Sequence, residues 1–230
     1  MGKLIVHMFV TLDGVYQAPG EPDEDLEGGF QLGGWQAPYL DAESGQVMFD
    51  EMASLDALLL GRKTYAIFAT YWPNAPAEVP FTGLLNATRK YAASRTMQAA
   101  DWSPTTIIRR VPEDVAGLKD EHHEIHVSGS GDLVHVLLRE ELVDRLNLWI
   151  YPVVLGNGKR LFDADPPTNA WRLVTCTSFA TGVVRLGYEL AGAAVYGDTG
   201  LDAAGGDWPP VPSPAVLDKM KHPADPDARR

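Results

Sequence analysis

Two short glycine-containing turns carry the residues best suited to bind a charged ligand. In the first turn, Gly61 ends an apolar run, and Arg62, Lys63 and Thr64 begin a predicted helix. Backbone N–H groups at a helix start have no partner within the helix, and the helix dipole also favours an anion there. Arg62 adds a guanidinium that can bind a phosphate through two hydrogen bonds. The alternative is a basic helix start that meets only solvent, and this turn alone does not decide between the two.

A second turn of the same kind follows a later strand. Gly129, Ser130 and Gly131 form it, and Asp132 is placed to cap the helix that continues through Leu133. Short Gly-Ser turns are common, and taken alone this one is more often structural than ligand-binding. Two such turns on neighbouring strands form a stronger signal, because ligands of open α/β sheets lie outside the carboxyl ends of the strands.

The elements that must position these turns alternate between strand and helix in the first two thirds of the chain. Apolar runs predict strands over 4–10, 57–60, 90–94, 105–109, 124–128 and 146–155. Helical spacing predicts helices over 44–54 with Ser44 as cap, 64–70, 112–119 and from Asp132 onward. Alternation around Thr181 and Gly182 predicts a hairpin over 171–180 and 183–190.

This order of elements predicts a mixed, mostly parallel sheet flanked by helices, with an antiparallel hairpin at its end. Pro152 lies inside the predicted strand 146–155 and indicates an edge position or a bulge, because proline cannot donate to a strand ladder. The segment 191–230 is rich in glycine and proline and predicts a tail, with a short helix over 216–221.

Composition excludes several classes of protein. The 230 residues carry a net charge of −12, which argues against binding to nucleic acid or to an anionic membrane. The single cysteine, Cys176, allows no internal disulfide and no multi-cysteine zinc site, and we predict no metal site. No apolar run approaches the ~20 residues that a membrane span needs, and no signal sequence opens the chain, so we expect a cytoplasmic protein.

Three residues outside the two turns have more than one interpretation. His7 lies within the first strand, where a packed, hydrogen-bonded core histidine is expected rather than a ligand. Asp13 precedes Gly14, and the favoured role is a turn aspartate rather than an acid near the reacting atoms. Trp35 belongs to the long segment 15–41, whose length is typical of a binding loop or lid. Its ring either closes over a ligand or pins the loop to the body.

Six motifs in their order along the chain resemble one known family. They are TLDG, LDALLLGRKTY, KYAASRT, IHVSGSGDLVHVLL, LVDRLNLWIYPVVLGNGKRLF and SFATGVVRLGYEL. The resemblance is to the bacterial dihydrofolate-reductase-like family that contains the reductase domain of riboflavin biosynthesis, the RibD C-terminal domain. It covers about residues 3–190. It implies a three-layer α/β reductase domain over 1–190, followed by the tail 191–230. It also implies a homodimer, for which a sheet edge at 149–154 is a candidate interface.

The resemblance implies a reductase that uses NADPH to transfer hydride to a small unsaturated substrate of the pterin or pyrimidine type. The implied cofactor-binding residues are Val10, Gly61, Arg62, Lys63, Thr64, Ser94, Arg95, Thr96, Gly129, Ser130, Gly131, Asp132 and Leu133. Within this set, Arg95 would lie by the 2′-phosphate, and this extra cation is the physical reason to prefer NADP over NAD. The implied substrate-pocket residues are Phe9, Asp13, Tyr16, Gln17 and Phe49.

One departure from the family's pattern concerns the catalytic acid. Dihydrofolate reductases carry a carboxylate early in the first helix, but that place falls here on Gly45 and Gln46, while Glu43 is expected to precede the helix. We therefore assign no catalytic residue and do not expect efficient reduction of dihydrofolate. The riboflavin-pathway substrate would need a ribose-phosphate pocket, and the chain has no zinc-deaminase motif. The alternative function is an NADP-binding sensor or interaction protein that has lost turnover.

Overall fold

The computed structural model describes residues 1–162 and 167–197. The chain separates into two compact units, Met1–Ala194 and Val195–Arg230. The helix expected over 216–221 lies outside the described residues. No helix in the described ranges is long and apolar enough to cross a lipid bilayer.

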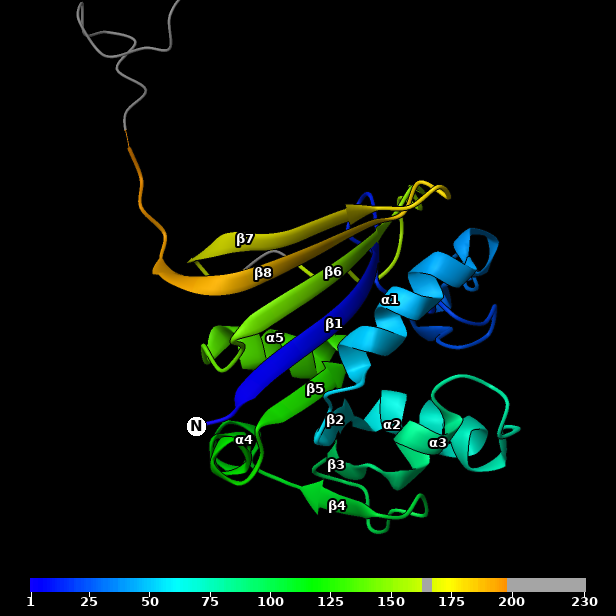
Figure 1. Ribbon diagram of the computed structural model, residues 1–230, viewed down its shortest axis with the longest axis vertical. Coiled ribbons are helices and arrows are strands. Elements are labelled where there is room, and N and C mark those ends of the chain that lie inside the picture. The colour runs from blue at the N-terminus through cyan, green and yellow to red at the C-terminus, as the bar shows by residue number, and fades with distance from the viewer. Residues whose placement is uncertain (163–166, 198–230) are drawn as a thin grey trace, which may run out of the picture. The chain divides into compact units, whose positions relative to one another are not determined.

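An eight-stranded sheet forms the centre of the first unit, counted over the described residues (Figure 1). Its strand order is β4-β3-β2-β5-β1-β6-β8-β7. Neighbours from β4 to β6 are parallel, whereas β8 is antiparallel to both β6 and β7, so the mixed sheet with a terminal hairpin is confirmed. The strands are β1 (Lys3–Thr11), β2 (Ala57–Gly61), β3 (Arg89–Ala93), β4 (Thr105–Ile108), β5 (Glu124–Ser128), β6 (Arg145–Tyr151), β7 (Asn169–Ser178) and β8 (Val184–Ala193).

Helices cover both faces of the parallel part of the sheet (Figure 1). They are α1 (Ala42–Met52), α2 (Arg62–Tyr71), α3 (Thr82–Ala87), α4 (Val111–Glu121) and α5 (Gly131–Arg139). Single 3-10 turns occur at Glu27–Gly29, Ala37–Tyr39 and Trp72–Asn74. Leu58 and Leu60 of β2 share a core with α1, α2 and α3, while Leu59 shares the opposite core with α4 and α5. The three-layer arrangement is therefore confirmed, and β2 is buried on both faces as its apolar run predicts.

Two helix caps differ from those predicted. Asp41, not Ser44, caps α1, because its carboxylate accepts a hydrogen bond from the Ser44 amide at 2.7 Å and Ser44 lies buried one turn inside. Glu43 also lies inside the first turn of α1 rather than before it. The cap of α5 is Ser130, with Asp132 in the first helical turn. Both differences arise because the helices begin earlier than the apolar spacing indicates.

The expectation that Pro152 marks an edge position or a bulge within a strand over 146–155 is wrong. The strand ends at Tyr151, before Pro152, and it pairs with β1 on one side and β8 on the other. Trp149 is fully buried between these neighbours. The segment 149–154 therefore offers no free sheet edge for a partner chain. The outer strands of the described sheet are β4 and β7.

Candidate functional site

The two glycine-containing turns meet at the carboxyl ends of β2 and β5, which are adjacent parallel strands. Thr64 Oγ1 donates to Ser130 Oγ at 3.1 Å, and the Gly61 amide donates to the Gly129 carbonyl at 3.4 Å. A methyl group on Gly61 would lie 2.3 Å from Ser130 Oγ, so no side chain fits at that position. The sheet topology thus brings together the two turns that the sequence singled out.

The helices that start at these turns have no side-chain cap of the kind that Asp41 gives α1. Neither α2 nor α5 has a side-chain hydrogen bond at its N-cap. The same holds for α3 and α4, so the missing cap distinguishes these two helices only from α1. In α2, the Thr64 amide reaches only Ser130 Oγ, at 3.4 Å. Free N–H groups therefore remain where α2 and α5 begin, which favours an anionic ligand.

Two cavities adjoin the turns and share part of their lining. The Arg95 cavity, of about 610 Å³, is lined by the loops after β2, β3 and β4 and by the start of α5. The Tyr16 cavity, of about 510 Å³, lies between β1, α2, the loop after β1 and the second turn. Both cavities are lined by Arg62, Lys63, Ser130 and Asp132. They form two ends of one crevice along the carboxyl edge of the parallel strands.

The Arg95 cavity gathers more cations than the sequence interpretation assigned. Ser94, Arg95 and Thr96 line it as predicted, together with Gly61 and Leu133. Arg109 and Arg110 also line it, and neither was predicted. Arg109 donates to the Ser94 carbonyl at 2.7 Å and also reaches the Met97 carbonyl, so it braces the loop that carries Arg95. Arg62 and Arg95 are exposed and have no side-chain partner within the described residues.

The Tyr16 cavity combines an aromatic and aliphatic wall with a few polar groups. Phe9, Tyr16 and Gln17, which we expect in a substrate pocket, line it together with Thr64, Gly129 and Gly131, which we expect at the cofactor. A methyl group on Gly131 would lie about 2 Å from the Tyr16 ring, so this glycine allows the ring to lie on the second turn. Burial, followed by the nearby Asp132 carboxylate, raises the pKa of the Tyr16 phenol to about 12. Tyr16 is therefore a neutral hydrogen-bonding group at neutral pH.

Three predicted site residues lie away from both cavities. Val10 belongs to the core on the α4 and α5 face of the sheet, because its side chain points opposite to that of Phe9. Phe49 lies on α1 and packs against Phe81. Asp13 organises a loop junction instead of lining a cavity, as the turn interpretation favoured.

The Asp13 carboxylate joins two distant segments of chain. It accepts from Thr11 Oγ1 at 2.6 Å, from the Gly156 amide at 2.8 Å, and from Arg160 Nη2 at 3.2 Å. Burial acts to raise the pKa of this carboxyl, but the hydrogen bonds from Thr11 and from the Gly156 and Leu155 amides outweigh it and lower the pKa to about 2. Asp13 is thus an ionised anchor and not a proton donor.

No carboxylate of α1 lines either cavity. Glu43 and Asp50 are exposed, and Glu51 lies at the far end of the helix, where it pairs with Arg185 of β8. His7 lines the Tyr16 cavity, yet its Nε2 is 3.0 Å from His126 Nδ1 within a buried network. Burial, followed by the charge effects of His126 and Arg185, holds the pKa of His7 well below its usual value. The core-histidine interpretation of His7 is confirmed.

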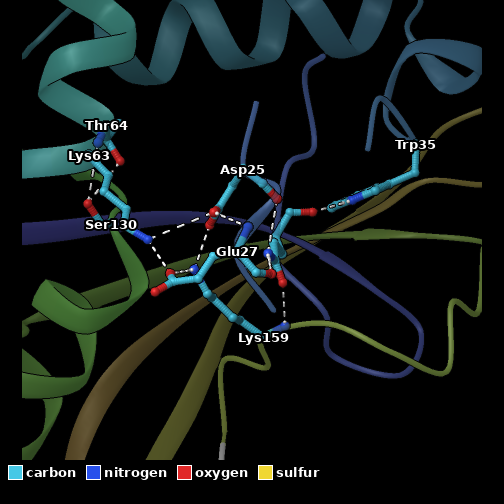
Figure 2. Close-up of polar contacts among 8 residues, drawn as sticks. Asp25, Glu27, Trp35, Lys63, Thr64, Ser130 and Lys159 are labelled. Atoms are coloured by element: carbon cyan, nitrogen blue, oxygen red, sulfur yellow. Dashed lines mark hydrogen bonds and ion pairs between the residues drawn. The ribbon is translucent and has the colours of Figure 1, made fainter. Parts of the chain in front are cut away.

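The long segment after β1 is tied to the body rather than extended into solvent. The Trp35 indole N–H donates to the Gln17 carbonyl at 2.8 Å (Figure 2). The Trp35 ring packs edge-on against Tyr151. Trp35 is nearly fully buried and does not line a cavity. The sequence left two roles open for Trp35, closing over a ligand or pinning the loop to the body. The structure shows that Trp35 pins the loop.

The strand order, the two turns and the crevice define a dihydrofolate-reductase-like α/β fold. The family model of the RibD C-terminal domain matches residues 2–185, and the chain belongs to that family.

Known proteins similar to this chain include the uncharacterized protein YyaP of Bacillus subtilis strain 168. It is 30% identical over 196 residues, which make up 83% of this chain and 96% of YyaP. A putative riboflavin biosynthesis protein from Shewanella sp. PV-4 shares the fold with a TM-score of 0.59 at 17% identity, over 82% of this chain and 98% of its own. A pyrimidine reductase-like protein from Corynebacterium diphtheriae also shares the fold, with a TM-score of 0.56 at 13% identity. The match covers 82% of this chain and 92% of that protein's chain.

Proposed function

We propose that this protein is an NADPH-dependent reductase that transfers hydride to a small unsaturated substrate of the pterin or pyrimidine type. The observation that carries this proposal is the crevice where two uncapped helix starts and the unpaired Arg62 and Arg95 converge. Membership in the RibD C-terminal family and the name of one structural neighbour, a pyrimidine reductase-like protein, support the same class of reaction.

The residues present fit a dinucleotide that carries an additional phosphate. The N–H groups at the starts of α2 and α5, together with Arg62, suit the pyrophosphate, because helix N-termini and guanidinium groups both bind phosphate oxygens. Arg95, which has no partner among the described residues, suits the 2′-phosphate at the other end of the Arg95 cavity. This separate cation is the reason to expect NADPH in preference to NADH.

The protein's contribution to the reaction would be binding, orientation and exclusion of water. The bound nicotinamide supplies the hydride. The wall formed by Phe9, Ile67 and Phe68 excludes water from the Tyr16 cavity, and the neutral Tyr16 phenol offers one hydrogen bond to a substrate. No side chain is assigned as the proton donor, because no carboxylate of α1 lines the cavity.

The test is a comparison of cofactor affinities in the wild type and in single variants. NADPH should raise the melting temperature more than NADH at the same concentration. Arg95→Ala should weaken NADPH binding by on the order of tenfold, the loss of one charge-assisted contact, and leave NADH binding nearly unchanged. Arg62→Ala should weaken the binding of both cofactors.

Arg89→Ala is the matched control, because Arg89 is exposed at the opposite end of β3. An NADPH affinity that is unchanged in Arg62→Ala and Arg95→Ala would remove the basis of the proposal.

A second candidate function is an NADP-binding sensor without turnover. The observation that favours it is the absence of an α1 carboxylate among the residues that line the Tyr16 cavity. Consumption of NADPH with any member of a panel of pterins, pyrimidines, quinones and aldehydes would decide for the reductase. Tight NADPH binding with no consumption across the panel would decide for the sensor.

A further inference from the structure

Four charged side chains form a closed ion-pair cluster (Figure 2), and three of them, Asp25, Lys63 and Lys159, line the Tyr16 cavity. Lys159 Nζ lies 2.6 Å from Asp25 Oδ2 and also contacts Glu27. Lys63 Nζ, which belongs to the first turn of α2, contacts Glu27 and lies 3.8 Å from Asp25 Oδ1. Two carboxylates therefore neutralise two ammonium groups that would otherwise face the cavity.

The backbone holds the two carboxylates in place. The Gln17 side chain, which is almost fully buried, donates to the carbonyls of Asp25 and Glu27, each at 3.0 Å. Its Oε1 accepts from the Lys159 amide at 3.1 Å. The Gln17 side chain thus holds the backbone of Asp25, Glu27 and Lys159. The ion-pair cluster therefore rests on a hydrogen-bonded loop and not only on contacts between long side chains.

This pairing leaves the Tyr16 cavity without a free cation for the substrate. Three acidic and three basic residues line the cavity among the described residues, and of the basic ones Lys63 and Lys159 are paired. The remaining base, Arg62, also lines the Arg95 cavity and is the residue proposed for the cofactor's pyrophosphate. A substrate phosphate group would need clustered cations or N–H groups. Here the two lysines are paired with carboxylates, and Arg62 is proposed to bind the cofactor's pyrophosphate.

The rest of the lining suits an uncharged ring. Met8, Phe9, Ala66, Ile67 and Phe68 contribute apolar surface, and Tyr16 contributes a neutral phenol. Glu24, an acid of the lining that pairs with neither lysine, would repel a phosphate, because like charges at short distance disfavour binding.

We propose that Asp25 and Glu27 are specificity-determining residues that restrict this site to substrates without a phosphate group. This inference rests on the proposed reductase function and specifies its substrate class as uncharged, unphosphorylated heterocycles. The two carboxylates act by occupying Lys63 and Lys159, which would form a phosphate-binding pair if released.

The test compares binding of uridine and uridine 5′-monophosphate to protein saturated with NADP⁺, by titration calorimetry. In the wild type, uridine 5′-monophosphate should bind no more tightly than uridine. In Asp25→Asn/Glu27→Gln, both lysines are released, and affinity for uridine 5′-monophosphate should rise on the order of tenfold while affinity for uridine stays unchanged. Adding Lys159→Ala to this variant should remove the gain.

The matched control is Glu21→Gln/Asp23→Asn, which makes the same charge change on two exposed side chains of the same loop and should produce no gain. The inference is overturned if Asp25→Asn/Glu27→Gln gains no affinity for uridine 5′-monophosphate. It is also overturned if the wild type binds uridine 5′-monophosphate more tightly than uridine and Lys159→Ala removes that difference. Circular dichroism and thermal unfolding, measured on each protein, report the folding of the variants. A wild type that does not bind NADPH would count against the proposed function instead.

Discussion

At the scale of single residues, the site depends on close approaches that only glycine permits. Gly61 lies against Ser130, and Gly131 lies against the ring of Tyr16. These contacts couple the two glycine-containing turns to each other and to the wall of the Tyr16 cavity. A side chain at either position would have to displace the neighbouring turn or the ring, because closely packed atoms leave no space for an added methyl group.

We expect Gly131→Ala to lower the free energy of unfolding by roughly 1–3 kcal/mol and to weaken NADPH binding, because the methyl group would lie about 2 Å from the Tyr16 ring. Urea denaturation and NADPH titration measure the two effects. Gly45→Ala is the control: it lies within α1 with open space around it, and there alanine should stabilise the protein by about 0.5–1 kcal/mol. The packing explanation would be contradicted if Gly131→Ala and Gly45→Ala changed the free energy of unfolding and the NADPH affinity equally.

Asp13 predicts a pH dependence with a defined sign. Its folded-state pKa of about 2 lies below the value of about 4 for an unfolded chain, so folding stabilises the ionised form. The contribution is fully present above pH 4 and is lost as the pH falls through 2. Asp13→Asn should therefore lower stability at pH 7, and the difference from wild type should shrink in acid.

Denaturation curves at several pH values measure this difference. Asp23→Asn, on an exposed side chain, serves as the control and should behave like wild type throughout. A stability gap for Asp13→Asn that stays constant down to pH 2 would exclude the ionised-anchor role.

At the scale of elements, the loop after β1 depends on one buried amide. Gln17→Met should leave the carbonyls of Asp25 and Glu27 and the Lys159 amide without their partner. A buried unpaired polar group costs about 1–3 kcal/mol, so the loop should open more often. Hydrogen exchange of the amides between residues 18 and 30 should accelerate by tenfold or more. Gln46→Met, which changes an exposed side chain on α1, should not accelerate it.

The elements themselves could largely be predicted from local patterns. Continuous apolar runs marked the strands, since a central parallel strand is buried on both faces, as β2 is. Helix α3 was not predicted, because it has six residues and begins after Phe81 at a positive φ, without a capping signal. The caps of α1 and α5 were misplaced because Asp41 and Ser44, or Ser130 and Asp132, are equally good capping types a few residues apart.

The site could be predicted only where it follows a strand end. The turns at Gly61 and Gly129 were found because ligands gather at the carboxyl ends of parallel strands. Arg109 and Arg110 were missed, although Arg109 ends the predicted strand 105–109, Arg110 follows it, and both obey the same rule. The contact between Asp25 and Lys159 joins residues 134 positions apart, and no local periodicity encodes such a pairing. Phe49 and Val10 lie away from both cavities, and the sequence did not indicate this because the direction of a side chain depends on the helix register or the strand face.

At the scale of the whole molecule, the strand order directs where a second copy would bind. The family resemblance implies a homodimer, and the interior position of β6 excludes the interface expected at 149–154. Of the two outer strands, β4 has four residues, whereas β7 has ten and exposes Leu173. A long free edge with exposed apolar side chains is the more suitable surface for pairing with another chain.

We therefore expect light scattering coupled to size-exclusion chromatography to report a dimer mass. Leu173→Lys should shift the population toward monomer, because a charge would have to be buried in the contact. Leu40→Lys, on an exposed leucine outside the sheet, should not shift it. If Leu173→Lys keeps the mass of a dimer, the interface lies elsewhere. If the wild type has the mass of a monomer, the expected dimer does not form.

The hydrogen bond between the Thr64 amide and Ser130 Oγ has a consequence for the heat of ligand binding. A phosphate oxygen that arrives at α2 replaces an acceptor that the protein already provides, so one hydrogen bond is exchanged for another. The enthalpy gained at this contact is accordingly small. The free energy of phosphate binding at the start of α2 would come instead from two other sources. One is the greater negative charge of the phosphate, and the other is the release of the water molecules that hydrate the phosphate in bulk solvent.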